Sequence, residues 1–172
     1  MTQLPRLDQS DVRADGSVTD LGPEAEAFGR CWAVVVSCID YRFVEPLRRF
    51  LATHQLTGIV DLIAWPGGAA ALATPDRETL LEAIGLACSL HDPAEIVLVA
   101  HHDCGRLGGS AYFPGRQAEI TALDTALAMA GETVADRFPD RWVRLVRLDR
   151  GGPLAVVDIP GRDAVLTSEQ SS

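Results

Sequence analysis

Five short apolar runs alternate with longer segments in which apolar residues recur every three or four positions. The runs span residues 32–37, 59–64, 95–100, 142–148 and 154–159. Continuous apolar runs of this length are typical of strands buried on both faces of a sheet. The first four runs therefore predict strands of a parallel sheet, because a helical segment separates each from the next.

Three of the intervening segments have helical spacing. The first follows Pro46, a residue favoured in the first turn of a helix. The second begins at residues 74–76, and the third runs through 119–129 and beyond Gly131. The face that the first helix is expected to bury carries residues at i, i+3, i+4 and i+7: Leu47, Phe50, Leu51 and His54.

A tight turn is predicted after the fourth strand, at Arg150-Gly151-Gly152. The run at 154–159 can then return only antiparallel, at an edge of the sheet. The sequence thus predicts an α/β fold, a single-domain three-layer αβα arrangement. Its centre is a four-stranded parallel sheet with one antiparallel edge strand.

Length and composition favour one domain. The chain has 172 residues, of which 47% are hydrophobic, enough for one ample core. Residues 1–22 are polar and aperiodic, so we expect a flexible segment or an arm laid on a partner subunit. The expected domain covers 23–162, and residues 163–172 form a polar tail.

Charge limits the classes of partner. The net charge is −9 and all 15 basic residues are arginines, which argues against nucleic acid or an anionic membrane. No apolar stretch approaches the length of a membrane span, and residues 1–26 do not resemble a secretory signal, so we expect a cytoplasmic protein. Two of the four cysteines lie in metal-ligand patterns, and a reducing compartment favours thiolate ligands over disulfides, so a disulfide framework is not expected.

Chemistry concentrates in two segments that follow predicted strands, Cys38-Ile-Asp-Tyr-Arg42 and His101-His-Asp-Cys-Gly105. Thiolate and imidazole are preferred zinc ligands, and a catalytic zinc keeps three protein ligands and one open position. Cys38, His101 and Cys104 supply such a set, and the spacing of the last two lets one loop reach a single ion. They are the predicted metal ligands, with Zn²⁺ as the cofactor.

Asp40 and Arg42 follow the first cysteine by two and four residues. In an extended segment leaving a strand, alternate side chains point the same way, so this pair is expected to flank the metal. An ordinary surface ion pair is the alternative. A further possibility is that Asp40 itself becomes a fourth ligand.

The pattern Cys-x-Asp-x-Arg followed by His-x-x-Cys-Gly resembles the β-class carbonic anhydrase family, over roughly residues 30–160. The resemblance implies that Cys38, His101 and Cys104 hold zinc and that Asp40 and Arg42 form the catalytic dyad. It implies reversible hydration of carbon dioxide to bicarbonate and a proton. It also implies a homodimer or a higher homo-oligomer.

The sequence departs from the family at Tyr41, where a serine is usual, and at 64–67, where Ala-Trp-Pro-Gly replaces Arg-Asn-Ala-Gly. Trp65 could line an apolar pocket, and the following glycine amides could face the substrate, or this segment could be a plain turn. Two alternatives therefore stay open. One is a related zinc hydrolase acting on carbon disulfide or carbonyl sulfide, and the other is a non-catalytic zinc-binding regulatory or scaffold protein.

The remaining cysteines and histidines are expected to be structural. Cys31 precedes the first strand, and Cys88 lies on the apolar face of a helix. His54 and His91 end helices, where an imidazole can satisfy the last carbonyls. His102 lacks the spacing to Cys104 and is expected beside the metal site or facing solvent.

Overall fold

The computed structural model describes residues 31–75, 77–149 and 155–159. The five strands within these ranges form one sheet. The strands follow one another in the order β2-β1-β3-β4-β5 across the sheet. The first four pair in parallel, and β5 pairs antiparallel with β4. Their bounds are β1 Ala33–Cys38, β2 Val60–Trp65, β3 Glu95–His101, β4 Trp142–Leu148 and β5 Ala155–Ile159. The predicted α/β architecture is confirmed, with strand limits within one residue of those expected.

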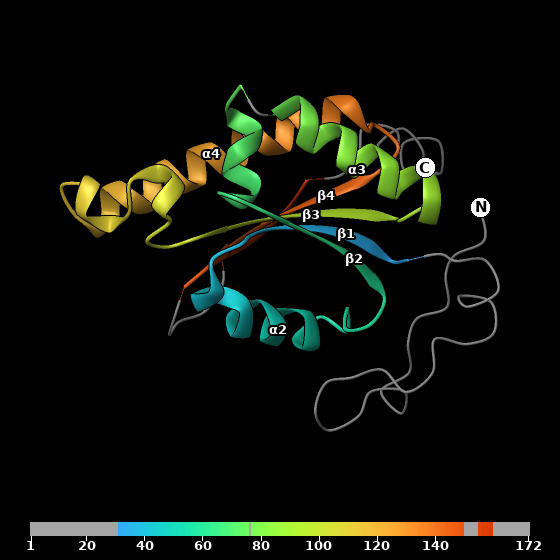
Figure 1. Cartoon of the computed structure of the whole chain (residues 1–172), viewed down its shortest axis with the longest axis horizontal. Coiled ribbons are helices and arrows are strands. Elements are labelled where there is room, and N and C mark those ends of the chain that lie inside the picture. The colour runs from blue at the N-terminus through green and yellow to red at the C-terminus, as the bar shows by residue number, and fades with distance from the viewer. Residues whose placement is uncertain (1–30, 76, 150–154, 160–172) are drawn as a thin grey trace, which may run out of the picture.

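Helices cover both faces of this sheet (Figure 1). Helix α2 (Val44–Thr53) lies on one face, and α3 (Arg77–His91) and α4 (Arg116–Arg137) lie on the other. In the described part of the chain, the connections contain four short 3₁₀ helices that the sequence pattern did not predict: η2 Tyr41–Phe43, η3 Gly68–Ala73, η4 Gly105–Leu107 and η5 Ser110–Tyr112. The predicted segment at 1–22 and the tail at 163–172 lie outside the described residues.

Two apolar clusters fill the interfaces between the sheet and the helices on its two faces. Alternate residues of β1 point to opposite sides, so Val34 and Val36 pack under α3 and α4 while Val35 packs against α2. Every residue of β3 is buried, as expected for a central parallel strand covered on both faces. On α2 the buried residues are Leu47 and Phe50, two positions of the predicted apolar face.

The order of the strands fixes where a site can form. The chain moves outward from β1 to β2 through α2, then crosses back past β1 to β3 through α3 (Figure 1). The crossovers therefore diverge between β1 and β3. In open α/β sheets this switch point, at the carboxyl ends of the strands, is where ligands bind.

Among the described helices, none has the length and apolarity to cross a membrane.

Candidate metal centre

The three predicted ligands meet at the carboxyl ends of β1 and β3. Cys38 is the last residue of β1, His101 is the last residue of β3, and Cys104 lies in the loop that follows. One ligand atom from each residue lies within 4.8 Å of the others. His101 and Cys104 are buried and Cys38 is half-buried. The fold therefore brings together side chains that are more than sixty residues apart in the sequence.

The ring of His101 is fixed with one nitrogen available to a metal. Its Nδ1 donates a hydrogen bond to the carbonyl oxygen of His102 at 2.8 Å, so Nε2 is the ring nitrogen that faces the two cysteines. Among the described residues this buried Nε2 has no hydrogen-bond partner. Phe43 packs against the ring, with the ring centroids 4.1 Å apart. Metal-binding histidines are usually oriented by a hydrogen bond of this kind, made by the ring nitrogen that does not bind the metal.

The two thiols are close enough to form a hydrogen bond with each other. A hydrogen bond from Cys104 lowers the pKa of the Cys38 thiol to about 4, while the same bond, together with burial, raises the pKa of Cys104. The backbone N–H of Gly67 also donates to Cys38 Sγ at 3.4 Å. One thiolate is thus available without a metal, and a divalent cation would favour the second. Two sulfurs and one imidazole nitrogen form a donor set that suits Zn²⁺.

Gly68 lets the backbone pass directly beside the end of β1. It adopts φ +54°, and a Cβ there would lie 2.7 Å from both the backbone N of Cys38 and the carbonyl oxygen of Val99. A side chain at this position would displace β1 or β3 near the ligands. Of the alternatives for this segment, the Gly67 amide does face the site, whereas Trp65 is partly buried and packs against the core.

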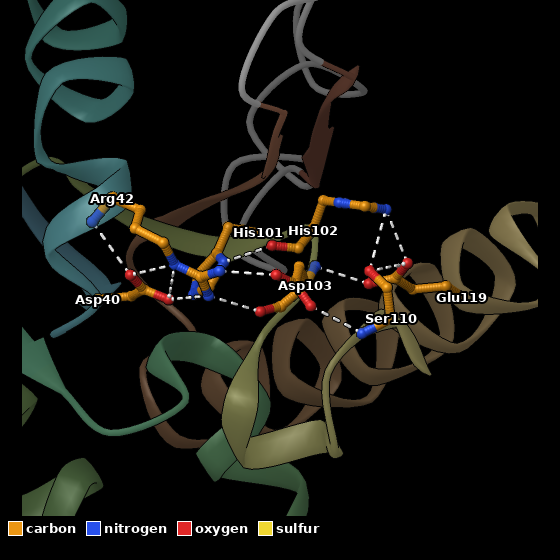
Figure 2. A network of polar contacts seen from close by, with 7 residues as sticks. All are labelled: Asp40, Arg42, His101, His102, Asp103, Ser110 and Glu119. Atoms are coloured by element: carbon orange, nitrogen blue, oxygen red, sulfur yellow. Dashed lines mark hydrogen bonds and ion pairs between the residues drawn. The ribbon is translucent and has the colours of Figure 1, made fainter. Parts of the chain in front are cut away.

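Asp40 and Arg42 form a close ion pair beside this cluster (Figure 2). Arg42 Nε lies 2.9 Å and 3.0 Å from the two carboxylate oxygens of Asp40, and Nη2 lies 2.5 Å from Oδ2. The predicted geometry was wrong in one respect. Arg42 is not in an extended segment but in the 3₁₀ helix η2, and Asp40 caps that helix by accepting from the Arg42 backbone N–H.

Arg42 holds Asp40 as a charged group outside the ligand cluster. Its hydrogen bonds lower the pKa of the Asp40 carboxyl to about 2. Cys38, His101 and Cys104 are the residues that gather within ligand distance, and Asp40 is not one of them. The side chain of Arg42 is anchored on its other side by Asp103, through the carboxylate at 2.6 Å and the backbone carbonyl at 2.8 Å.

Three residues of this site were not assigned a role from the sequence: Asp103, Ser110 and Glu119. A fourth, His102, was expected beside the metal site or facing solvent. Glu119 is 2% exposed and accepts from the Asp103 backbone N–H at 2.6 Å and from the Ser110 hydroxyl at 2.8 Å. His102 Nε2 lies 2.7 Å from Glu119 Oε2. Figure 2 shows that these contacts continue the Asp40–Arg42 pair into one network ending on α4.

The other cysteines and histidines lie elsewhere. Burial and the nearby carboxylate of Asp61 raise the pKa of the Cys31 thiol to about 12, and burial raises the pKa of Cys88. His54 packs against Phe50 at 4.5 Å between ring centroids. His91 does not serve the helix end as expected, because its Nδ1 lies 2.7 Å from the Asp61 carboxylate.

The fold and the site define an α/β protein with a candidate Cys-His-Cys metal site at the switch point of a parallel sheet. Residues 28–130, well over half of the chain, match the family described as putative carbonic anhydrase. The chain belongs to this family.

Two uncharacterised proteins are also similar. One, from Rickettsia conorii, is 24% identical over 113 residues, which cover 62% of this chain and 61% of that protein. The other, from Rickettsia bellii, is 23% identical over 113 residues, covering 62% of this chain and 69% of that protein. The chain spans about three fifths of the length of the first of these relatives.

Solved structures with a similar backbone fold include two fungal β-carbonic anhydrases. A tetrameric enzyme from Sordaria macrospora superposes with a TM-score of 0.48 at 16% identity, covering 78% of this chain and 84% of that one. The β-carbonic anhydrase CafA of Aspergillus fumigatus gives a TM-score of 0.47 at 14% identity, covering 83% of each chain.

Proposed function

We propose that the protein is a zinc enzyme that hydrates carbon dioxide reversibly to bicarbonate and a proton. The metal would be held by Cys38, His101 and Cys104. The observation that carries the proposal is the cluster of one ligand atom each from Cys38, His101 and Cys104 within 4.8 Å of one another, with the buried Nε2 of His101 lacking a hydrogen-bond partner among the described residues. Membership of the putative carbonic anhydrase family supports the same activity.

The metal and the protein would contribute different parts of the chemistry. When bound, zinc lowers the pKa of coordinated water from 15.7 toward about 7, which makes a nucleophile available near neutral pH. The chain supplies three ligands whose positions are fixed by β1, β3 and the close approach of Gly68. It also supplies an anion, Asp40, whose pKa of about 2 keeps it ionised at every physiological pH.

Asp40 is proposed to accept a hydrogen bond from the attacking water and so to orient it toward the substrate carbon. Arg42 is proposed to hold the carboxylate away from the metal, through contacts to both of its oxygens. An anion that was free to move would be drawn to a divalent cation at short range and would take the position that water needs. The ion pair therefore keeps one coordination position open.

A homodimer is proposed as the smallest assembly. Edge strand β2 has its free side at the margin of the described sheet, and Leu62 on it is 53% exposed. Near the end of β1, the side chains of Ile39, Tyr41 and Val44 are also exposed. An edge strand with neighbouring apolar side chains is a typical surface for pairing with another chain.

Zinc analysis combined with stopped-flow measurement of carbon dioxide hydration tests the proposal. Zinc with rapid hydration supports it. Zinc with hydrolysis of carbonyl sulfide or carbon disulfide, and no hydration, would assign the site to the related zinc hydrolases. Zinc with none of these activities would make the protein a non-catalytic member of the family.

A further inference from the structure

A second cluster of metal-binding side chains lies at the opposite end of the sheet. It contains Cys31, two residues before β1, Asp61 in β2 and His91 at the end of α3. One ligand atom from each lies within 4.8 Å of the others. Cys31 and Cys38 are seven positions apart along a mainly extended segment, so this cluster lies roughly 23 Å from the candidate catalytic centre. We propose that Cys31, Asp61 and His91 form a second zinc site.

The donor types suit zinc. A thiolate, an imidazole and a carboxylate are all zinc ligands, and three protein ligands with a water completing the shell is an ordinary tetrahedral arrangement. The sulfur of Cys31 and Oδ2 of Asp61 are 3.5 Å apart, close to the roughly 3.6 Å expected between sulfur and oxygen ligands of one tetrahedral zinc. These two side chains are already placed for a shared ion.

His91 completes the set with a small movement. Its Nδ1 lies 2.7 Å from Asp61 Oδ2, about 0.7 Å closer than two ligands of one zinc should be. The imidazole is 40% exposed and stands on the last residue of a helix, so it has room to withdraw by that amount. Asp61 is 27% exposed, which leaves water access to the fourth coordination position.

Asp61 is an unusual residue type for its position in the fold. Aspartate is depleted in strands, yet this carboxylate lies in β2 beside a buried thiol. Two arginines at this end of the sheet are paired with other carboxylates: Arg141 with Asp92 at 2.8 Å and with Asp140 at 3.3 Å, and Arg144 with Glu95 at 2.9 Å. A zinc ion would neutralise the Asp61 carboxylate and join three segments: the chain entering β1, strand β2 and the end of α3. The competing explanation is a simple Asp61–His91 ion pair with a neutral thiol beside it.

Counting zinc in site-directed variants distinguishes the two explanations. Metal-free protein is loaded with zinc, dialysed and analysed, with circular dichroism to confirm that each variant is folded. We expect about two zinc ions per parent chain and about one in Cys31→Ser or His91→Ala. The matched controls are Cys88→Ser, on the same helix as His91, and His54→Ala, at the end of another helix. Both should keep the zinc content of the parent.

Cys38→Ser separates this site from the catalytic one. It should retain about one zinc per chain, which the double variant Cys38→Ser/His91→Ala should lose. Equal zinc in the parent, Cys31→Ser and His91→Ala would overturn the second site, as would complete loss of zinc in Cys38→Ser alone. A single zinc that survives Cys38→Ser but not His91→Ala would support the second site and refute the proposed catalytic one.

Cadmium NMR gives a readout that loss of folding cannot imitate. The chemical shift of bound cadmium increases with the number of thiolate ligands, so a site with one cysteine and a site with two should give separate resonances. In the folded His91→Ala variant the resonance of the one-cysteine site should shift or disappear, while that of the two-cysteine site should remain. A single resonance in the parent protein, unaffected by His91→Ala, would overturn the inference.

Discussion

The buried carboxylate of Glu119 accepts a hydrogen bond from the backbone N–H of Asp103, at 2.6 Å. Asp103 lies between the candidate ligands His101 and Cys104 and adopts φ +58°, a conformation that needs support in a residue other than glycine. Helix α4 therefore fixes the backbone of the loop that connects the candidate ligand His101, at the end of β3, to the candidate ligand Cys104. Through Asp103, the same contact also fixes the far side of Arg42.

Replacing Glu119 should destabilise the protein. Glu119→Ala removes the acceptor for the Asp103 N–H and for the Ser110 hydroxyl, so a loss of about 2–4 kcal/mol in the free energy of unfolding is expected. Urea denaturation measures this loss. Glu82→Ala, at an exposed position of α3, is the control and should stay within about 0.5 kcal/mol of the parent. An equal, small effect at both positions would show that the Glu119 contacts do not stabilise the loop.

Removing Arg42 should close the proposed open coordination position. In Arg42→Ala the Asp40 carboxylate loses its partner and is drawn to the zinc, so hydration should fall by about two orders of magnitude with unchanged zinc content. In Asp40→Ala the hydration rate should fall less, because the fourth coordination position stays open. Arg48→Ala, which removes an exposed arginine paired with Glu45, is the control and should hydrate carbon dioxide like the parent. Full activity in Arg42→Ala would show that Asp40 and Arg42 form an ordinary ion pair with no role in keeping the coordination position open.

A side chain at position 68 should disturb the ends of β1 and β3. Gly68→Ala places a Cβ within 2.7 Å of two backbone atoms at a positive φ, so a loss of about 2–4 kcal/mol is expected. Denaturation and zinc content are the measurements. At Gly105, by contrast, an added Cβ meets nothing within 4 Å, and Gly105→Ala should be close to neutral. Similar stability of the two variants would contradict the close approach.

The proposed homodimer depends on the apolar margin of β2. Leu62→Asp should shift the protein toward monomer in analytical ultracentrifugation, because a charge would be buried where two edge strands meet. Leu86→Asp, at an exposed position of α3, is the matched control. Dissociation by Leu86→Asp and not by Leu62→Asp would place the interface on the other face of the molecule.

The strands, and the three side chains that gather near their carboxyl ends, could be predicted because their signals are local. The valines of β1 and the apolar run of β3 mark buried parallel strands, and each ends at a residue type that commonly binds metals. Strand order then brings Cys38 and His101 together without any further information, because β1 and β3 are neighbours. Whether these residues bind zinc stays a prediction.

The supporting contacts could not be predicted in the same way, because they depend on how distant segments pack. Glu119 meets Asp103 only once α4 lies against the loop, although one signal was present: Glu119 falls in line with the buried Leu123 and Leu127, where a carboxylate needs a partner. The 3₁₀ helix at Arg42 has no periodicity to reveal it. Asp61 in the apolar run of β2 was a comparable signal for the second cluster.

Carbon dioxide hydration by the zinc-loaded protein and its Cys104→Ser variant tests the central claim most directly. Both are compared in a stopped-flow assay with Cys88→Ser, in which the replaced thiol lies on α3 away from the ligands. The parent and Cys88→Ser should hydrate carbon dioxide far faster than buffer, and Cys104→Ser should lose this activity together with the zinc at its site. A zinc-containing parent that hydrates carbon dioxide no faster than buffer, or a Cys104→Ser variant as active as the parent, would contradict the proposed function.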